Sequence, residues 1–152
     1  MSNDIIIRKA NESDLEDVLK LITMPSIDDG NIMELHDARA VYQSILDDSN
    51  YFQIVASTET EIVGIVTLVI IVQMTHEGST TAFIDDLIVS DNITDTDKRL
   101  DIASELLEFA ISLAQEYGCY KTVIDNDYLT ELTELASQHF DFSHNKNSFL
   151  RL

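Results

Sequence analysis

The stretch FIDDLIVSDNITDTDKRLDIASELLEFAISLAQEYGCYKTVIDN, residues 83–126, decides the fold. Its first residues continue an apolar, β-branched run, which predicts a strand over 80–90. A long amphipathic helix follows, because apolar residues recur on one face at Ala103, Leu106, Leu107, Ala110, Leu113, Ala114 and Tyr117. Gly118 predicts the end of this helix, and CYKTVI predicts a second strand over 119–124. A strand, a helix and a strand in this order favour a right-handed crossover between parallel strands.

The residues before this stretch predict two helices and three strands. DIIIR predicts a strand over 4–8, and apolar residues at helical spacing predict helices over 13–22 and around 35–45. YFQIVAS and IVGIVTLVIIVQM then predict two strands that form antiparallel hairpins with each other and with the strand over 80–90.

The C-terminal residues predict a helix over 129–138 and one or two closing strands. The fold class is therefore α/β (α+β), with a mixed, mostly antiparallel central sheet of about six or seven strands and about four helices. We expect a single domain over residues 1–152.

The charge of the chain excludes some partners. It has 28 Asp and Glu against 9 Lys and Arg, a net charge of −19, and no Lys or Arg lies between Arg39 and Lys98. Such a surface repels phosphate backbones, so no nucleic-acid partner is expected, whereas a cationic ligand is allowed. The charge alone also fits a role in solubility.

Targeting and metal-binding signals are weak. The N-terminus does not resemble a secretory signal, and the longest apolar run, 62–74, is shorter than the roughly 20 residues of a membrane-spanning helix. We therefore expect a cytoplasmic protein that does not enter a membrane. Cys119 is the only cysteine, and the histidines lack the spacing of metal ligands, so no disulfide and no metal site is expected.

The segments FIDDLIV, IASELLEFAISLA and YGCYKTVIDN, in this order of elements, resemble the GNAT superfamily of N-acetyltransferases. The resemblance spans nearly the whole chain and implies a GNAT-like acyl-CoA N-acyltransferase fold with acetyl-CoA as co-substrate. It also implies that backbone groups of Leu87, Ile88 and Val89 contact the pantetheine arm. Asn126, at the end of the next strand, is a further candidate for a hydrogen bond to the pantetheine amide.

The resemblance places the pyrophosphate at the start of the long helix, where the family pattern is Q/R-x-x-G-x-G/A. The matching residues are Lys98, Arg99, Leu100, Asp101, Ile102 and Ala103. Asp101 replaces the central glycine, which adds bulk and like charge beside a bound diphosphate. Two alternatives remain: Lys98 and Arg99 receive phosphates, or Asp101 only stabilises the helix dipole from the first turn.

Catalysis in the family needs a base for the attacking amine and an acid for the leaving thiolate. Asp85 and Asp86 lie on the strand beside the expected pantetheine site, and strand alternation places Asp85 on the face of Leu87 and Val89. A half-buried carboxylate there suits a general base, although either aspartate also fits simple pairing with a neighbouring donor. For the general acid, Ser137 stands where relatives carry Tyr, and Tyr128 is the candidate substitute.

These observations lead to one hypothesis and its rivals. The chain is expected to transfer an acetyl group from acetyl-CoA to a primary amine of a small cationic molecule or peptide. The departures at Asp101 and Ser137 leave open a non-catalytic GNAT-like module that binds a metabolite or a protein. An acidic decoy for a nucleic-acid-binding protein rests on charge alone. Family members often dimerise, so a homodimer also stays open.

Overall fold

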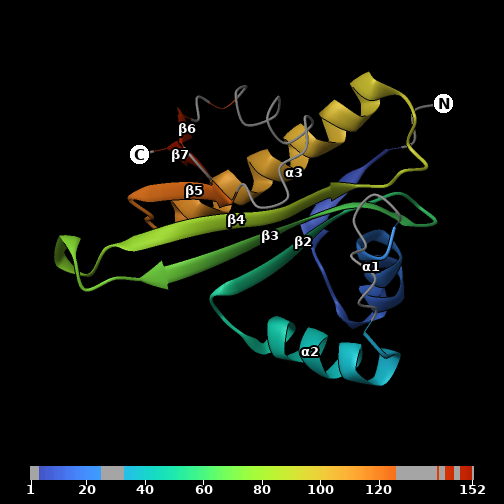
Figure 1. Ribbon diagram of the computed structural model, residues 1–152, viewed down its shortest axis with the longest axis horizontal. Coiled ribbons are helices and arrows are strands. Elements are labelled where there is room, and N and C mark those ends of the chain that lie inside the picture. Colours follow the sequence, from blue (N-terminus) through green and yellow to red (C-terminus); the bar gives the residue numbers. More distant parts are fainter. Residues whose placement is uncertain (1–3, 25–32, 126–139, 141–142, 146–147, 152) are drawn as a thin grey trace.

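The computed structural model describes residues 4–24, 33–125, 140, 143–145 and 148–151 (Figure 1). Its described strands form one seven-stranded sheet in the order β1-β2-β3-β4-β5-β7-β6. The strands are β1 (Ile6–Lys9), β2 (Tyr51–Ser57), β3 (Ile62–Val72), β4 (Thr80–Val89), β5 (Lys121–Asp125), β6 (Ser143–Asn145) and β7 (Ser148–Arg151). The helices are α1 (Leu15–Ile22), α2 (Leu35–Asp47) and α3 (Thr96–Glu116), with short 3-10 turns at Glu12–Asp14 and His76–Gly78.

The predicted topology is confirmed. β1 to β4 pair antiparallel in sequence order, and β4 pairs parallel with β5 after the crossover through α3. The two closing strands are present as β6 and β7. The helix predicted over 129–138 lies outside the described residues.

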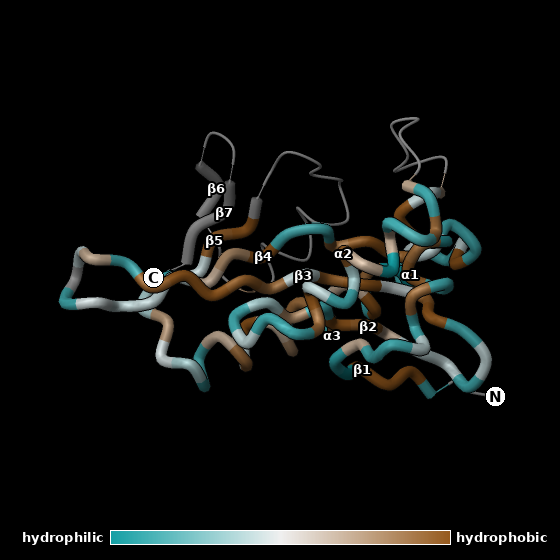
Figure 2. Tube along the Cα trace, turned by 90° about the horizontal axis from the view of Figure 1, so that it is seen from below, coloured by the Kyte–Doolittle hydropathy of each residue, from teal (hydrophilic) through white to brown (hydrophobic). Residues whose placement is uncertain are grey.

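Helices cover both faces of the sheet. α3 lies on one face, and its apolar side packs with residues of β2, β3 and β4 in the larger core cluster (Figure 1). α1 lies on the opposite face, where Val18 and Leu21 pack against Val55, Ile65 and Ile88. Figure 2 shows hydrophobic residues running along the central strands between these layers. β3 and β4 are covered on both faces over much of their length, which explains their nearly continuous apolar sequence.

Both ends of α3 differ slightly from the prediction. The helix begins at Thr96, after the N-cap residue Asp95, so Asp101 lies in the second turn and not in the first. At the other end, Gly118 adopts a φ of 71°, and the N–H of Cys119 donates to the Ala114 carbonyl. This bond closes a Schellman-type turn. It delays the next strand, which begins at Lys121 and not at Cys119.

Gly64 on β3 allows the close approach of α3 to the sheet. A Cβ atom at this position would lie 2.9 Å from Leu106 Cδ1 and 3.2 Å from both Ile102 Cγ2 and the Ile88 carbonyl oxygen. The backbone oxygen cannot move aside without disturbing the β3–β4 pairing. The absence of a side chain therefore sets the distance between α3 and the sheet.

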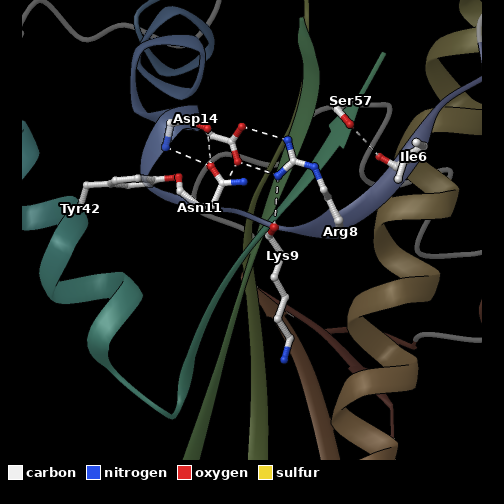
Figure 3. A network of polar contacts seen from close by, with 8 residues as sticks. Ile6, Arg8, Lys9, Asn11, Asp14, Tyr42 and Ser57 are labelled. Atoms are coloured by element: carbon white, nitrogen blue, oxygen red, sulfur yellow. Dashed lines mark hydrogen bonds and ion pairs between the residues drawn. The ribbon is translucent and has the colours of Figure 1, made fainter. Parts of the chain in front are cut away.

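A polar network joins β1, α1 and α2 (Figure 3). The Arg8 guanidinium donates two hydrogen bonds to the Asp14 carboxylate, at 2.7 and 2.9 Å. Asp14 also accepts from the Asn11 N–H, and the Tyr42 hydroxyl donates to the Asn11 carbonyl at 2.7 Å. The hydrogen bonds from Arg8 lower the pKa of Asp14, and burial raises the pKa of Tyr42 to about 12. Asp14 is therefore ionised and Tyr42 neutral at pH 7.

Substituting Gly64→Ala should destabilise the fold. The added methyl group overpacks the contact between α3 and β3, and such overpacking typically costs about 1–3 kcal/mol. Urea unfolding followed by circular dichroism measures the loss as a lower midpoint at an unchanged slope. An unchanged midpoint would show that α3 moves away from the sheet at no cost.

Substituting Asp14→Asn should lower the free energy of unfolding by about 1–3 kcal/mol at pH 7, because Arg8 loses its charged partner. Since the folded pKa of Asp14 is lowered, this contribution is complete above the ordinary carboxyl pKa of about 3.9. It disappears as the pH falls through the folded pKa. Denaturant titrations at several pH values should therefore show the two proteins converging in strong acid.

The matched control is Asp17→Asn. Asp17 pairs with Lys20 at 3.4 Å on the surface, where 77% of the Lys20 side chain is exposed. Exposed pairs contribute about 0.2–1 kcal/mol, so this variant should stay close to the wild type at every pH. Equal effects of the two substitutions would contradict the special role of the Arg8–Asp14 pair.

Candidate functional site

A β-bulge in β4 sets the geometry of the candidate site. Ile65 pairs with Ile88 and Thr67 pairs with Asp85, so Asp86 and Leu87 together lie opposite the single residue Val66. Asp86 adopts a φ of 52°, in the left-handed region, and its N–H donates to Asp85 Oδ1 at 2.7 Å. Asp and Asn tolerate this conformation better than most residues. The second residue of the acidic pair, Asp86, is therefore also the first residue of the bulge.

The bulge overturns the predicted side-chain alternation. Ala82 and Ile84 belong to the core cluster beneath α3, and so do Leu87 and Val89 on the far side of the bulge. Asp85, adjacent to Ile84, therefore lies on the opposite face of the sheet from Leu87 and Val89. The prediction that Asp85 shares their face was wrong, because one inserted residue reverses the period-two alternation.

In the described part of the chain, the pairing of β4 with β5 ends just before the bulge. Their parallel pairing covers only Thr81–Ile84 against Lys121–Ile124, and β4 then continues to Val89. The Ser90 N–H donates to the Val63 carbonyl of β3, so the N–H and C=O of the preceding residue, Val89, point away from β3. In the described part of the chain, β5 does not cover this edge of β4. The Val89 carbonyl accepts from Arg99 at 3.4 Å, so the Val89 N–H is the group that this edge offers to an extended ligand.

The side chains of the predicted pantetheine segment face the core and not this opening. Leu87, Ile88 and Val89 are 9%, 6% and 2% exposed. Only their backbone can contact a ligand, as a strand does when it adds an extended chain to its edge. The structure thus offers main-chain hydrogen bonding at the position where the resemblance places pantetheine.

A polar cluster that the sequence analysis missed lies on the face of Asp85. It consists of Tyr51, Gln53, Thr67 and Asp85, which come from three neighbouring strands. Gln53 Nε2 donates to the Val66 carbonyl at 3.2 Å, opposite the bulge, and Thr67 Oγ1 lies 3.5 Å from Gln53 Oε1. Gln53 and Thr67 are almost fully buried, whereas Asp85 and Tyr51 are half-buried. We call these four residues the central polar cluster.

The phenol of the central polar cluster is influenced by two carboxylates, Asp85 of the cluster and the neighbouring Asp86. The pKa of Tyr51 is raised, first by burial and then by the charges of Asp86 and Asp85, while a hydrogen bond with Thr67 acts in the opposite direction. Tyr51 is therefore a neutral hydroxyl beside two anionic groups. The sequence does contain a signal for this cluster. One polar residue stands inside each apolar strand, Gln53 in YFQIVAS and Thr67 in IVTLV, and alternation with period two places it on one face of its strand.

The residues expected to hold the diphosphate lie at the start of the long helix, as predicted, but deeper in it. Because α3 begins at Thr96, Lys98 and Arg99 lie in its first turn and Leu100 to Ala103 in its second. Ile102 and Ala103 are buried in the core, and Asp101 is exposed on the side of α3 that faces the start of β1. N–H groups from Arg99 onwards are used within the helix, the first of them donating to the Asp95 carbonyl.

Arg99 binds the chain itself. Its guanidinium donates to the carbonyls of Ser90 at 2.6 Å and Ile93 at 3.0 Å, and it lies 3.4 Å from the Val89 carbonyl. Lys98 lines a pocket of about 450 Å³ together with Asp4, Ile5, Asp101, Ile102 and Glu105. The two cations of the predicted motif therefore point to different places, and acidic side chains surround Lys98.

Several predicted features cannot be placed. Asn126, Tyr128 and Ser137 lie outside the described residues. Among the described residues, no group of three or more His, Cys, Asp or Glu side chains is arranged to hold a metal ion. No helix of the described part is both long enough and apolar enough to cross a membrane.

Comparisons with known proteins agree with this fold. Glucosamine-6-phosphate N-acetyltransferase from Arabidopsis thaliana is 16% identical, with a TM-score of 0.77 and 94% coverage of both chains. An aminoglycoside acetyltransferase from an uncultured soil sample, solved with sisomicin, is 21% identical, with a TM-score of 0.72 and coverage of 94% of this chain and 91% of that chain. A predicted acetyltransferase from Clostridium acetobutylicum, solved with acetyl-CoA, is 14% identical, with a TM-score of 0.70 and coverage of 93% and 92%.

Curated proteins give no significant match by sequence. The family model described as "Acetyltransferase (GNAT) family", in contrast, matches residues 16–140, which include the bulged strand, the crossover helix and β5. This match covers most of the chain, and the topology agrees with it. The chain belongs to the GNAT acetyltransferase family.

Proposed function

We propose that this protein transfers an acetyl group from acetyl-CoA to a primary amine of a small cationic molecule or peptide. The observation that carries the proposal is the edge of β4, which continues to Val89 after the last pair with β5 in the described residues, Ile84 with Ile124. Pantetheine is an extended chain with two amides, so it can pair with this edge as a short strand would. The thioester then lies beside the bulge at Asp86.

The acetyl transfer itself is a direct attack. The amine nitrogen forms a bond to the thioester carbonyl carbon, the C–S bond breaks, and the sulfur leaves as a thiolate. One amine proton passes to a base, and the thiolate takes up a proton, so the products are an N-acetyl amine and a free thiol. Backbone N–H groups at the open edge would stabilise the negative charge that develops on the carbonyl oxygen.

Asp85 is our candidate for the base. It is half-buried on the face of the central polar cluster, whereas Asp86 is exposed. A carboxylate in this setting is able to accept a proton from the amine directly or through one water molecule. Asp85 and Asp86 would also attract an acceptor that carries positive charge, in keeping with the net charge of −19. The structural relatives that acetylate amino sugars or aminoglycosides support an amine acceptor.

A non-catalytic module is the second candidate, and one observation favours it. The start of α3 carries Asp95, Asp97 and Asp101, all in or near the segment where the family binds a diphosphate. An assay of the free thiol released from acetyl-CoA in the presence of a panel of amines distinguishes the transferase from the non-catalytic module. Release that depends on the amine supports the transferase, and its absence despite a measurable donor affinity supports the module.

The variants Asp85→Asn and Asp86→Asn test the assignment of the base. Both remove one charge at nearly constant volume, and Asn tolerates the left-handed conformation at position 86. We expect Asp85→Asn to lower kcat by about 10²–10⁴-fold, the usual contribution of general acid–base catalysis. The KM for acetyl-CoA should stay nearly constant.

Asp86→Asn is the matched control and should change kcat only a few-fold. Steady-state rates over a range of pH complete the comparison, since the loss of a base removes the acidic limb of the kcat profile. A larger loss in Asp86→Asn than in Asp85→Asn would contradict the assignment. Acetylation rates equal to the wild type in both variants would contradict a carboxylate base in this strand.

A further inference from the structure

The N–H groups at the start of α3 already have an acceptor. Asp95 Oδ1 accepts hydrogen bonds from the N–H groups of Asp97, at 2.9 Å, and Lys98, at 3.3 Å. The Arg99 N–H donates to the Asp95 carbonyl at 2.9 Å. The carboxylate of Asp95 thus occupies the anion position that a helix N-terminus offers to a phosphate. A diphosphate would have to displace a covalently tethered anion.

The loop between β4 and α3 is also closed on itself. The N–H of Asn92 donates to Ser90 Oγ at 3.2 Å, and the N–H of Ile93 donates to the Ser90 carbonyl at 3.1 Å. The N–H of Asp91 lies 3.2 Å from Met24 Sδ. A loop that wraps a phosphate needs N–H groups directed at the ligand. Here the N–H groups of Asp91, Asn92 and Ile93 are directed at other atoms of the protein.

The charged side chains at the start of α3 also disfavour the binding of a diphosphate. Arg99 contacts the loop directly, and its guanidinium is held by the carbonyls of Ser90 and Ile93. These contacts fix the loop in the closed form. Lys98 lies beside the acidic groups of Asp4, Asp101 and Glu105. The residues of the expected diphosphate site therefore do not fit a diphosphate in this arrangement.

At the pantetheine end of the site, Arg99 reaches the Val89 carbonyl, at 3.4 Å, but not the Val89 N–H. The N–H of Val89 points away from β3, and the described pairing of β4 with β5 ends at Ile84 and Ile124. The described part of the chain thus offers main-chain hydrogen bonding to the pantetheine arm of the donor. To the diphosphate it presents acidic side chains and N–H groups that are already hydrogen-bonded within the chain. This contrast points to the class of donor that the protein recognises.

We propose that this protein recognises its acyl donor through the acyl-pantetheine thioester and gains little affinity from the nucleotide diphosphate. The proposal rests on the proposed function and specifies its donor. Acetyl-CoA and S-acetyl-pantetheine are then comparable donors. Asp95 is the residue that prevents the nucleotide diphosphate from adding to the affinity.

Calorimetry with CoA and with pantetheine tests the proposal without using activity. We expect dissociation constants that agree within about tenfold, which corresponds to at most about 1.4 kcal/mol from the nucleotide. CoA binding that is a hundredfold tighter or more would overturn the inference and leave the proposed function intact. Absence of binding for both compounds would overturn the proposed function and the inference together.

Substitutions at the start of α3 test whether the Asp95 cap is the reason that the nucleotide adds little affinity. Asp95→Gly frees the N–H groups of Asp97 and Lys98 and removes one charge, and glycine is an acceptable N-cap residue that costs only a few tenths of a kcal/mol. We expect CoA to bind about tenfold more tightly to this variant and pantetheine to bind as before. Asp95→Asn, which keeps the cap without the charge, should have an intermediate effect.

Asp97→Asn is the matched control, because it removes one charge from the same turn but leaves the cap in place. Its affinity for CoA should change less than that of Asp95→Gly. Circular dichroism at the concentrations used for calorimetry verifies that each variant is folded. Equal affinities for CoA in Asp95→Gly and Asp97→Asn would overturn the role of the Asp95 cap.

Discussion

The left-handed backbone of Asp86 is the constraint on which the rest of the site depends. One extra residue in β4 at this point places Asp86 and Leu87 opposite Val66 and changes the direction of the strand. Before the bulge, β4 pairs with both neighbours, and after it β4 pairs only with β3 in the described part of the chain. Among the described residues, the bulge thus lies next to an edge of β4 that no strand covers, just after the parallel pairing with β5 ends.

The same bulge separates the two chemical environments of β4. Leu87 and Val89 turn toward α3 and anchor the strand in the core, while Asp85 turns toward the central polar cluster. A ligand at the edge of β4 would therefore meet backbone donors along one direction and a half-buried carboxylate beside them. Burial and the charges of Asp85 and Asp86 keep Tyr51 protonated, so the cluster also offers a neutral hydroxyl. This division suits a thioester at the edge and a cationic amine on the face of α1.

Much of the architecture could be predicted from the sequence, because periodicity determines it. The amphipathic pattern of α3, the apolar runs of β3 and β4, and Gly118 were enough for the crossover and the hairpins. The faces of Asp85 and Leu87 could not be predicted, since FIDDLIV gives no sign of an inserted residue and strict alternation was assumed. The start of α3 was also obscured, because Asp95 is one of several acidic residues in the preceding loop. Its role as N-cap depends on a hydrogen bond and not on composition. The central polar cluster needs the register of three strands, which no single segment contains.

The most direct test of the account is backbone amide hydrogen exchange with and without saturating pantetheine. The account predicts slower exchange at the N–H of Val89, on the open edge of β4, and unchanged exchange at Asp97 and Lys98, which are bound by Asp95. Unchanged exchange at Val89, with protection gained at the start of α3, would contradict it.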